Sequence, residues 1–263
     1  MSVYLGIGDA AHTMSKRYVG IDDQARQVWK MYVGVDEQAW LVYQSGSPIG
    51  NLAVGKTVKI AVGGKDHDWL VVHQGLPGSM YDASCYGAWL VLKNIYTTSK
   101  FGVYNSYKDS TIHSYLNSTF YNLIDSNIRA AIKQVKIPYQ NGRGNNGSLA
   151  TGANGLSVKV FLLSGYEVGL TTSDNSFFPK DGAKLKYFGS SSGGNSSRVA
   201  YTGTVPAGWW LRSPGTASSF NFWYVQADGN YGYNSCSGYE GGIRPCMILP
   251  QDTLVDETGR VIA

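Results

Sequence analysis

Trp209-Trp210-Leu211-Arg212-Ser213-Pro214 and Gly241-Gly242-Ile243-Arg244-Pro245-Cys246-Met247-Ile248-Leu249-Pro250 bracket the stretch of this chain that decides its fold. Both ends combine large apolar side chains, a proline with a fixed φ angle and an arginine. Strands are predicted at residues 209–212 and 243–249 within these ends, and at residues 222–226 between them. An unpaired buried charge is costly, so we expect Arg212 and Arg244 to be held by backbone carbonyls or a carboxylate. The two ends are therefore predicted to belong to the core.

Residues 218–239, between these ends, consist mainly of Ser, Asn, Tyr, Phe, Gly, Asp and Cys. Tyr offers rigid amphipathic contact area, while Ser, Asn and Gly offer adaptable hydrogen bonding. A rigid frame around such a stretch predicts a ligand-binding surface, and the alternative is an ordinary polar loop between two strands. The predicted binding residues are Ser218, Ser219, Phe220, Asn221, Tyr224, Asn230, Tyr231, Tyr233, Asn234, Ser235, Ser237 and Tyr239, with the four tyrosines as stacking anchors.

The composition favours a strand-rich and loop-rich protein. Of its 263 residues, 43% are hydrophobic and 15% charged, so the chain can bury a sizeable core. The 33 glycines and 19 tyrosines, without long charged helical stretches, argue against a helical protein. A net charge of +4, dispersed along the chain, argues against nucleic acid as a partner.

The three cysteines, Cys85, Cys236 and Cys246, form no C-x-x-C pair and are expected to be structural thiols. The first 16 residues lack the features of a secretory signal peptide. No apolar stretch reaches the length of about 18 residues that a membrane span requires. We therefore expect synthesis in a reducing cytoplasm without membrane insertion. A role outside the cell would need another route of exit, such as a virus particle.

No set of residues predicts catalysis. The histidines, at positions 12, 67, 73 and 113, are scattered and have no metal-ligand spacing. Gly165-Tyr166-Glu167-Val168-Gly169 lacks the serine of a nucleophile elbow. The aspartates at positions 125, 174 and 181 show no spacing that argues for a carboxylate pair. The sequence thus predicts neither an enzyme nor a cofactor nor a metal site.

A short repeat occupies the N-terminus. Tyr18-Val19-Gly20-Ile21-Asp22-Asp23-Gln24-Ala25 returns as Tyr32-Val33-Gly34-Val35-Asp36-Glu37-Gln38-Ala39, and each copy predicts a β-hairpin. Two hairpins have too little core to stand alone. We expect an attachment module at residues 1–47 and a ligand-binding domain at residues 48–263. The hairpin resembles adaptor elements of prophage tail and baseplate proteins; the alternative is a plain β-appendage of the same domain.

Local patterns predict the elements between the repeat and residue 209. Strands are expected at residues 57–62, 68–74 and 88–96, with Gly63-Gly64 as the first turn, and another strand begins at residue 160. One helix should begin at Asp109-Ser110-Thr111, and a second at Ser126-Asn127 with Val135 on its inner face. Residues 142–155 and 189–195 should be exposed loops, and residues 251–263 a last small hairpin.

Several motifs together resemble one known group. They are Thr111-Ile112-x-x-Tyr115-Leu116-Asn117, Val135-Lys136-Ile137-Pro138-Tyr139, Val160-Phe161-Leu162-Leu163-Ser164, Val225-x-x-Asp228-Gly229 and the two ends quoted above. Over residues 54–250 the chain resembles a domain common in prophages of Gram-positive bacteria, with a C-type-lectin-like fold related to the formylglycine-generating enzymes. The resemblance implies an α+β fold, rich in loops, with two helices and a mixed, mostly antiparallel sheet.

This group includes variable proteins of diversity-generating retroelements. In these, mutagenesis of AAY codons near the C-terminus produces residues such as Asn, Tyr, Ser, Phe, Asp, Cys and Gly, which residues 218–239 match. Trp223, Gln226 and Glu240 do not follow from an AAY codon and would be fixed. The Glu-Pro-Asn and Trp-Asn-Asp motifs of calcium-dependent lectins and the reactive cysteine pair of the formylglycine-generating enzymes are absent. Neither calcium-dependent sugar binding nor the oxidase activity is therefore implied.

The resemblance implies a phage or prophage receptor-binding or adhesion protein that displays a diversified surface. Its expected partners are a protein or glycan on a bacterial cell surface and, through the N-terminal repeat, other phage tail proteins; a homo-oligomer stays open. Its expected location is the phage tail of the virion. Two alternatives remain, a fixed structural protein of a tail or baseplate and an enzyme of the formylglycine-generating type.

Overall fold

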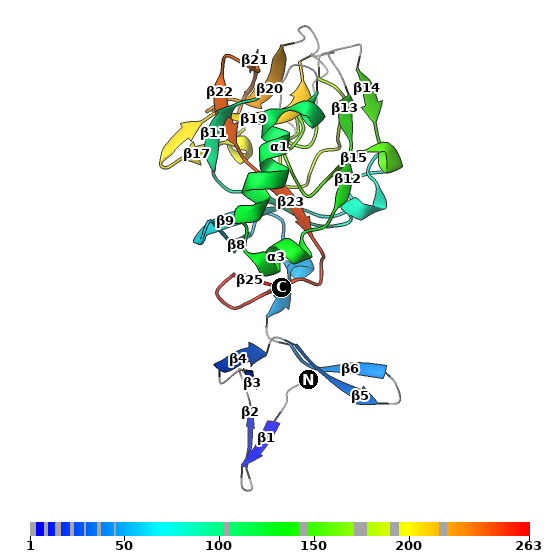
Figure 1. Ribbon diagram of the computed structural model, residues 1–263, viewed down its shortest axis with the longest axis vertical. Coiled ribbons are helices and arrows are strands. Elements are labelled where there is room, and N and C mark those ends of the chain that lie inside the picture. Colours follow the sequence, from blue (N-terminus) through cyan, green and yellow to red (C-terminus); the bar gives the residue numbers. More distant parts are fainter. Residues whose placement is uncertain are drawn as a thin grey trace.

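The computed structural model describes residues 46–102, 106–141, 147–170, 178–189, 195–215 and 220–263 with their side chains, and the backbone of six strands within residues 4–44. The described residues form a mixed α+β structure in which strands predominate (Figure 1). Most strand pairs are antiparallel, and two five-stranded sheets supply nearly half of the core residues. The predicted α+β class is confirmed at this level.

The first sheet has the order β16-β23-β10-β9-β8 and is antiparallel throughout. Its strands are β8 (Thr57–Val62), β9 (Lys65–Gly75), β10 (Gly87–Leu92), β16 (Val160–Phe161) and β23 (Cys246–Leu249). Gly63 and Gly64 form the turn between β8 and β9 with φ angles of 60° and 76°, which glycine adopts without a steric cost. The predicted strand at residues 57–62 and its turn are confirmed. β10 ends at Leu92, before the predicted residue 96.

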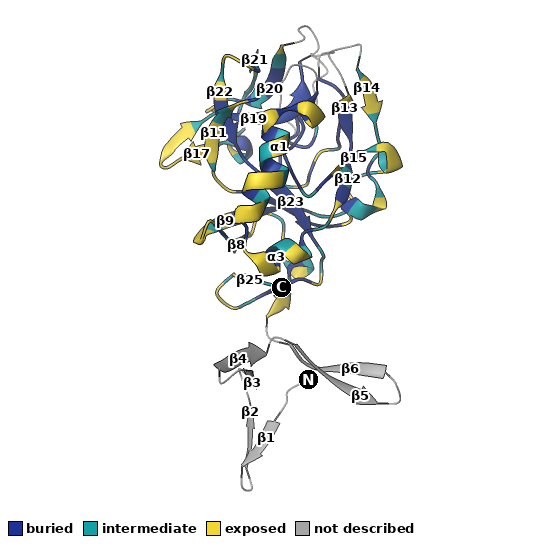
Figure 2. Cartoon of the chain, in the orientation of Figure 1, coloured by how far each residue is buried: buried dark blue, intermediate teal, exposed yellow. Residues whose placement is uncertain are grey.

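The second sheet has the order β11-β22-β19-β20-β21. Its strands are β11 (Thr97–Lys100), β19 (Trp209–Pro214), β20 (Asn221–Val225), β21 (Tyr231–Ser235) and β22 (Glu240–Ile243). β19 and β22 are parallel and the other neighbours antiparallel, so the sheet is mixed. Figure 2 shows β19 and β23 deeply buried, whereas the small hairpin at β17 is exposed.

The predicted single strand at residues 243–249 is wrong. β22 ends at Ile243 in the second sheet, and β23 begins at Cys246 in the first sheet. Arg244 and Pro245 carry the chain from one sheet to the other. Pro245 has no amide hydrogen to donate to a ladder, although its carbonyl accepts from Leu92 N at 2.9 Å. The Arg-Pro step therefore joins the two sheets.

Two helical segments cover part of the core. The first runs through α1 (Thr111–Tyr115), a π-helical turn (Leu116–Phe120) and α2 (Tyr121–Leu123), and the second is α3 (Ser126–Ala131). Ser110 caps α1 by accepting from His113 N, as the sequence predicts. The N-cap of α3 is Asp125, which accepts from Asn127 N, and Val135 lies in strand β12 instead of this helix. The predicted cap and inner face of the second helix are thus corrected.

Short strand pairs and one three-stranded sheet accompany the two large sheets. They are β12 (Val135–Ile137) with β15 (Leu156–Val158), β13 (Tyr139–Asn141) with β14 (Ser148–Ala150), β17 (Ala200–Thr202) with β18 (Val205–Ala207), and the sheet β25-β24-β7 (Val261–Ile262, Leu254–Val255, Ser47–Pro48). β24 and β25 form the predicted C-terminal hairpin. Part of each predicted exposed loop, residues 142–146 and 190–194, lies outside the described residues.

The N-terminal repeat has three copies, whereas two are predicted. The hairpins are β1–β2 (Tyr4–Ile7, Ala10–Thr13), β3–β4 (Arg17–Ile21, Gln24–Val28) and β5–β6 (Lys30–Val35, Gln38–Gln44). Tyr4, Tyr18 and Tyr32 start the copies at 14-residue intervals. The signal for the first copy, Tyr4-x-Gly6-Ile7-x-Asp9-x-Ala11, is present but degenerate.

The following domain takes in residues just before the predicted boundary at residue 48. Ser47 pairs with Val255 in the sheet that holds the C-terminal hairpin. Gly46 has a φ of +90°, and a Cβ atom there would lie 2.6 Å from the carbonyl oxygen of Val255. The chain therefore enters the domain at Gly46, beside the C-terminal hairpin.

A buried ion pair holds the centre of the domain. Arg212 donates to both carboxylate oxygens of Glu167 at 2.5 and 2.7 Å, and to the carbonyls of Pro138, Leu162 and Asp181 at 3.1, 2.9 and 2.8 Å. These five contacts match the five N–H donors of a guanidinium. The expectation that Arg212 is anchored by carbonyls or a carboxylate is thus confirmed.

Arg244 is held differently. Its Nε donates to the carbonyl of Leu92 at 2.7 Å, and its guanidinium lies 4.9 Å from the ring centre of Trp209. Burial lowers the pKa of Arg244 to about 10. A carbonyl and an aromatic face replace the carboxylate that Arg212 has, so the two arginines brace the two ends of the stretch by different means.

Candidate ligand-binding surface

Most of the predicted binding residues that the structure describes lie on the hairpin of β20 and β21, at the end of the domain away from β25 and the C-terminus (Figure 1). Its turn closes through Gln226 N, which donates to the carbonyl of Asn230 at 2.9 Å. Gly229 has a φ of +80° and lies so close to Asn195 that a Cβ would meet its carbonyl at 2.2 Å. A glycine is therefore required in this turn.

Buried Arg198 fixes the turn to the rest of the domain. Its Nε donates to the carbonyl of Gly229 at 2.7 Å, while its Nη1 donates to the carbonyl of Val168 at 3.2 Å. Trp209 Nε1 in turn donates to the carbonyl of Arg198 at 3.0 Å. The sequence does not reveal this role of Arg198, because Val168 and Gly229, whose carbonyls its side chain contacts, are 30 and 31 residues away. The hairpin is thus tied to the buried strand β19.

The strand register divides the predicted residues between two faces of the sheet. Residues paired directly across two strands share a face, and successive residues alternate between faces. Asn221 pairs with Ser235, Trp223 with Tyr233, and Val225 with Tyr231 on one face. Phe222 with Asn234, and Tyr224 with Gly232, lie on the opposite face. The predicted single surface is therefore two surfaces.

The first surface, which we call the aromatic face, consists of Phe178, Trp223, Tyr231 and Tyr233. Phe178 stacks on Trp223 with ring centres 3.9 Å apart and an interplanar angle of 23°. Tyr231 and Tyr233 meet the Trp223 ring at 5.7 and 5.5 Å in edge-to-face contacts. Tyr233 is 62% exposed, whereas Trp223 is 4% exposed. An exposed tyrosine thus rests on buried rings that limit its motion.

The second surface is packed more tightly into the protein. Tyr224 and Tyr239 have ring centres 5.1 Å apart, and both contact the buried ring of Trp210, at 6.1 and 5.2 Å. A Cβ atom at Gly232 would lie 2.7 Å from the Tyr224 ring, so the glycine allows this ring to lie across β21. Both tyrosines are half-buried. Both tyrosines pack against Trp210, and their partly exposed ring edges face the surface.

Several polar residues already have structural partners. Asn230 Oδ1 accepts from Tyr231 N, and Asn234 Oδ1 accepts from Ser235 N, both at 2.9 Å. Ser235 Oγ accepts from Gly238 N at 3.2 Å and lies 3.4 Å from Ser237 Oγ. These side chains satisfy backbone groups of the hairpin and the following turn. Their predicted role in ligand contact therefore competes with a structural one.

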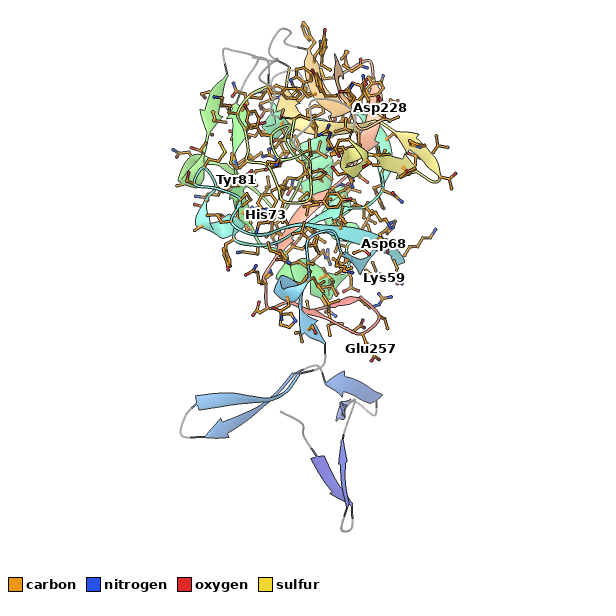
Figure 3. All side chains as sticks on the ribbon, turned by 180° about the vertical axis from the view of Figure 1, so that it is seen from behind. Lys59, Asp68, His73, Tyr81, Asp228 and Glu257 are labelled. Carbon is orange, nitrogen blue, oxygen red and sulfur yellow. The ribbon has the colours of Figure 1, made fainter. Side chains whose placement is uncertain are left out.

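The remaining predicted residues lie beside the hairpin. Phe220 is 50% exposed and directly precedes β20. Ser218 and Ser219 lie outside the described residues. Within residues 220–240, Asp228 and Glu240 are the only carboxylic acids and there is no Lys, Arg or His. Asp228 lies in the turn of the hairpin, where its carboxylate accepts from Asn230 N, at the end of the domain away from Glu257 (Figure 3). The surface is thus aromatic and polar with little charge.

Phe178 is the member of the aromatic face that sequence reasoning missed. It lies 45 positions before Trp223, next to Pro179, and neither periodicity nor composition marks it. A Cβ at Gly165 would lie 2.6 Å from the Phe178 ring, so this ring packs directly on the backbone of Gly165. Only the tertiary contact identifies Phe178 as part of the face.

The cysteines have the character of core residues. Cys85, Cys236 and Cys246 are buried and form no disulfide. Burial raises the pKa of the Cys85 thiol to about 12, and it also raises the pKa of the Cys236 and Cys246 thiols. Thiols in this state are weak nucleophiles. The prediction of structural thiols is consistent with this burial.

Among the residues that the structure describes, no three His, Cys, Asp or Glu side chains are grouped so that they could hold a metal ion. None of the helices described reaches the length and apolar character that a bilayer span requires.

Comparison with known families gives one result. A model described as a domain of unknown function, DUF6273, matches residues 86–251, well over half of the chain. The chain belongs to the DUF6273 family. The DUF6273 match contains the whole second sheet and both helical segments, but it omits β8 and β9, which pair with β10 in the first sheet. Neither the curated proteins nor the solved structures contain a match.

Proposed function

We propose that this DUF6273 protein is a binding protein that recognises a partner on a bacterial cell surface through its aromatic face. The observation that carries the proposal is the exposed Tyr233, which rests on the stacked pair of Trp223 and Phe178. Anchors of protein interfaces are typically aromatic residues whose positions are fixed by their neighbours, with polar groups around them. Asn221 and Ser235 are partly exposed on the same face and supply such groups.

The position of the face within the domain supports this proposal. The chain enters at Gly46, and Ser47 and Pro48 then pair with the C-terminal hairpin, whereas β20 and β21 lie at the opposite end (Figure 1). A protein held through its N-terminal hairpins would present the aromatic face outwards. We therefore infer that residues 1–45 attach the protein, to phage tail proteins in the case of a prophage product, and that the aromatic face binds.

The finer identity belongs to the same proposal. A phage or prophage receptor-binding protein with a C-type-lectin-like domain and a diversified surface accounts for the buried frame and for the Tyr, Asn and Ser content of the hairpin. A fixed structural protein of a tail or baseplate would bury the same face against a neighbour. Sequencing the DNA around the gene separates these cases, because diversification requires a reverse transcriptase gene and a near-copy of the coding stretch for residues 209–245.

Binding of the fluorescently labelled full-length protein to candidate host cells tests the role of the face. Tyr231→Ala together with Tyr233→Ala should reduce binding at least about thirtyfold, because truncating a central anchor costs about 2 kcal/mol or more. Tyr86→Ala is the matched control, since Tyr86 is 55% exposed and lies in a different part of the fold. EDTA should leave binding unchanged. Undiminished binding by the double variant, or loss with EDTA, would contradict the proposal.

A further inference from the structure

Residues 178–189, which we call the clasp, link the aromatic face to the two sheets. Phe178 begins the clasp and stacks on Trp223. Further along, Leu185 N donates to the carbonyl of Glu167 and Tyr187 N to the carbonyl of Val72, both at 3.0 Å. Ala183 N donates to the hydroxyl of Tyr81 at 2.9 Å. The clasp is thus held by a series of separate contacts and has no strand or helix of its own.

Asp181 occupies an unusual place in the clasp. Its side chain is fully buried, and the Ser213 hydroxyl lies 3.0 and 2.9 Å from its two oxygens. That hydroxyl has a single hydrogen to donate. The neighbouring Arg212 guanidinium contacts the Asp181 carbonyl, while its charge is paired with the Glu167 carboxylate. The geometry therefore provides little compensation for a negative charge on Asp181.

The ionisation of Asp181 responds to this burial. Burial raises the pKa of the Asp181 carboxyl to about 7; the Arg212 charge and hydrogen bonds from Ser213 and from the Asp181 backbone oppose the rise, and the Glu167 charge adds to it. Tyr166 also lies within electrostatic range of Asp181, and Tyr81 donates to Glu167 at 2.8 Å. Of these neighbouring groups, Arg212 carries the positive charge and Glu167 the negative charge that face Asp181.

His73 holds the other half of the clasp. Its Nδ1 accepts from Lys186 N at 3.3 Å, and an imidazole accepts there only while that nitrogen is unprotonated. Burial and the charge of Lys186 lower the pKa of His73. Figure 3 shows His73 and Tyr81 on the same flank of the domain. A titratable group with a shifted pKa therefore lies at each half of the clasp, Asp181 within the first half and His73 against the second.

We propose that residues 178–189 form a proton-sensitive clasp in which Asp181 positions Phe178 and thereby the rings of the aromatic face. When residues 178–183 are packed against the sheets, which we call the docked state, burial favours a neutral Asp181. Ionisation of Asp181 releases Phe178 from Trp223. The positioning role for ligand recognition rests on the function proposed above. The clasp itself can be measured without any ligand.

The direction of the pH effect follows from linkage. An undocked Asp181 has an ordinary pKa near 3.8, below its docked value of about 7. Docking then takes up a proton between these values, so it weakens as pH rises from about 4 to about 7 and changes little above that. The lowered pKa of His73 acts in the opposite sense, because docking at Lys186 weakens as pH falls below 6.5. A comparison that cancels the His73 effect is therefore needed.

Hydrogen exchange of the full-length protein provides the comparison that cancels the His73 effect. Exchange is followed by mass spectrometry from pH 5 to pH 8 and corrected for intrinsic rates. Asp181→Asn keeps an oxygen acceptor for Ser213 but cannot ionise, and both proteins retain His73. The ratio of wild-type to Asp181→Asn exchange in residues 178–183 should rise at least about tenfold between pH 5 and pH 7.5, since one pKa unit corresponds to a factor of ten. The same step should appear in residues 221–235.

The control is Asp68→Asn, which removes an exposed carboxylate beside Lys93. The ratio of wild-type to Asp68→Asn exchange should stay flat across this pH range. A flat ratio for Asp181→Asn would overturn the clasp. A step confined to residues 178–183 would overturn its control of the aromatic face. Neither outcome depends on binding, so failure of the proposed function would be seen separately, as unchanged cell binding by the Tyr231 and Tyr233 double variant.

Discussion

β19 and β21 belong to the same sheet, with only β20 between them, yet they differ sharply in burial. All six residues of β19 are buried, and they include two tryptophans and the arginine of the central ion pair. No residue of β21 is buried, and Tyr233 at its middle is largely exposed. β19 has a neighbouring strand on each side and is buried on both faces, whereas β21 is the last strand of the sheet. The difference predicts that changes in β19 act on stability and changes in β21 on binding.

Removal of the Arg212 charge should have the largest effect. Arg212→Leu leaves the fully buried Glu167 carboxylate without its partner, which typically costs about 3–5 kcal/mol in the free energy of unfolding. Urea denaturation measures this loss. Arg212→Leu combined with Glu167→Gln should recover at least about 1 kcal/mol, because the unpaired charge is then gone. A single variant as stable as the wild type would show that β19 does not depend on this ion pair.

Trp210 provides the next test of the comparison. Its ring lies between Phe101, Tyr224 and Tyr239, with its Nε1 donating to the carbonyl of Ser99 at 2.9 Å. Trp210→Ala should lower the free energy of unfolding by about 3 kcal/mol, at the lower end of the usual range because the half-exposed tyrosines can move into the space. Thermal unfolding checks this value. A loss below about 1 kcal/mol would mean that the second surface is not part of the frame.

Tyr233 should give the smallest change in stability. Tyr233→Ser removes an exposed ring and its edge contact with Trp223, which contributes about 1 kcal/mol or less to stability. Binding to host cells should nevertheless fall, because this ring is the exposed anchor of the aromatic face. Thermal unfolding and cell binding of the same preparation separate the two effects. A melting loss equal to that of Trp210→Ala would abolish the distinction between frame and face.

Features that depend on neighbouring residues could be predicted from the sequence. Alternation of apolar residues defined β8, and the adjacent Gly63-Gly64 defined its turn. Ser110 marked the start of α1, since a cap acts within one turn of the helix. The burial of the Arg212 region followed from its apolar neighbours and proline. These effects operate over a few residues, so the local sequence contains the information.

Features that depend on pairing across the chain required the tertiary structure. Glu167 as the partner of Arg212, Arg198 as the anchor of the turn at Gly229 and Phe178 as the base of the aromatic face all join distant segments. The crossing of the chain between sheets at Arg244-Pro245 is likewise invisible in a run of apolar residues.

The sequence by itself determined that residues 209–250 combine an apolar frame with a stretch rich in tyrosine and asparagine. Only the tertiary structure decided that Tyr231 and Tyr233 share a face while Tyr224 takes the opposite one. The physical reason is the two-residue period of a strand, in which a shift of register by one residue exchanges the faces. Composition is unaffected by such a shift, whereas the surface available to a ligand depends on it.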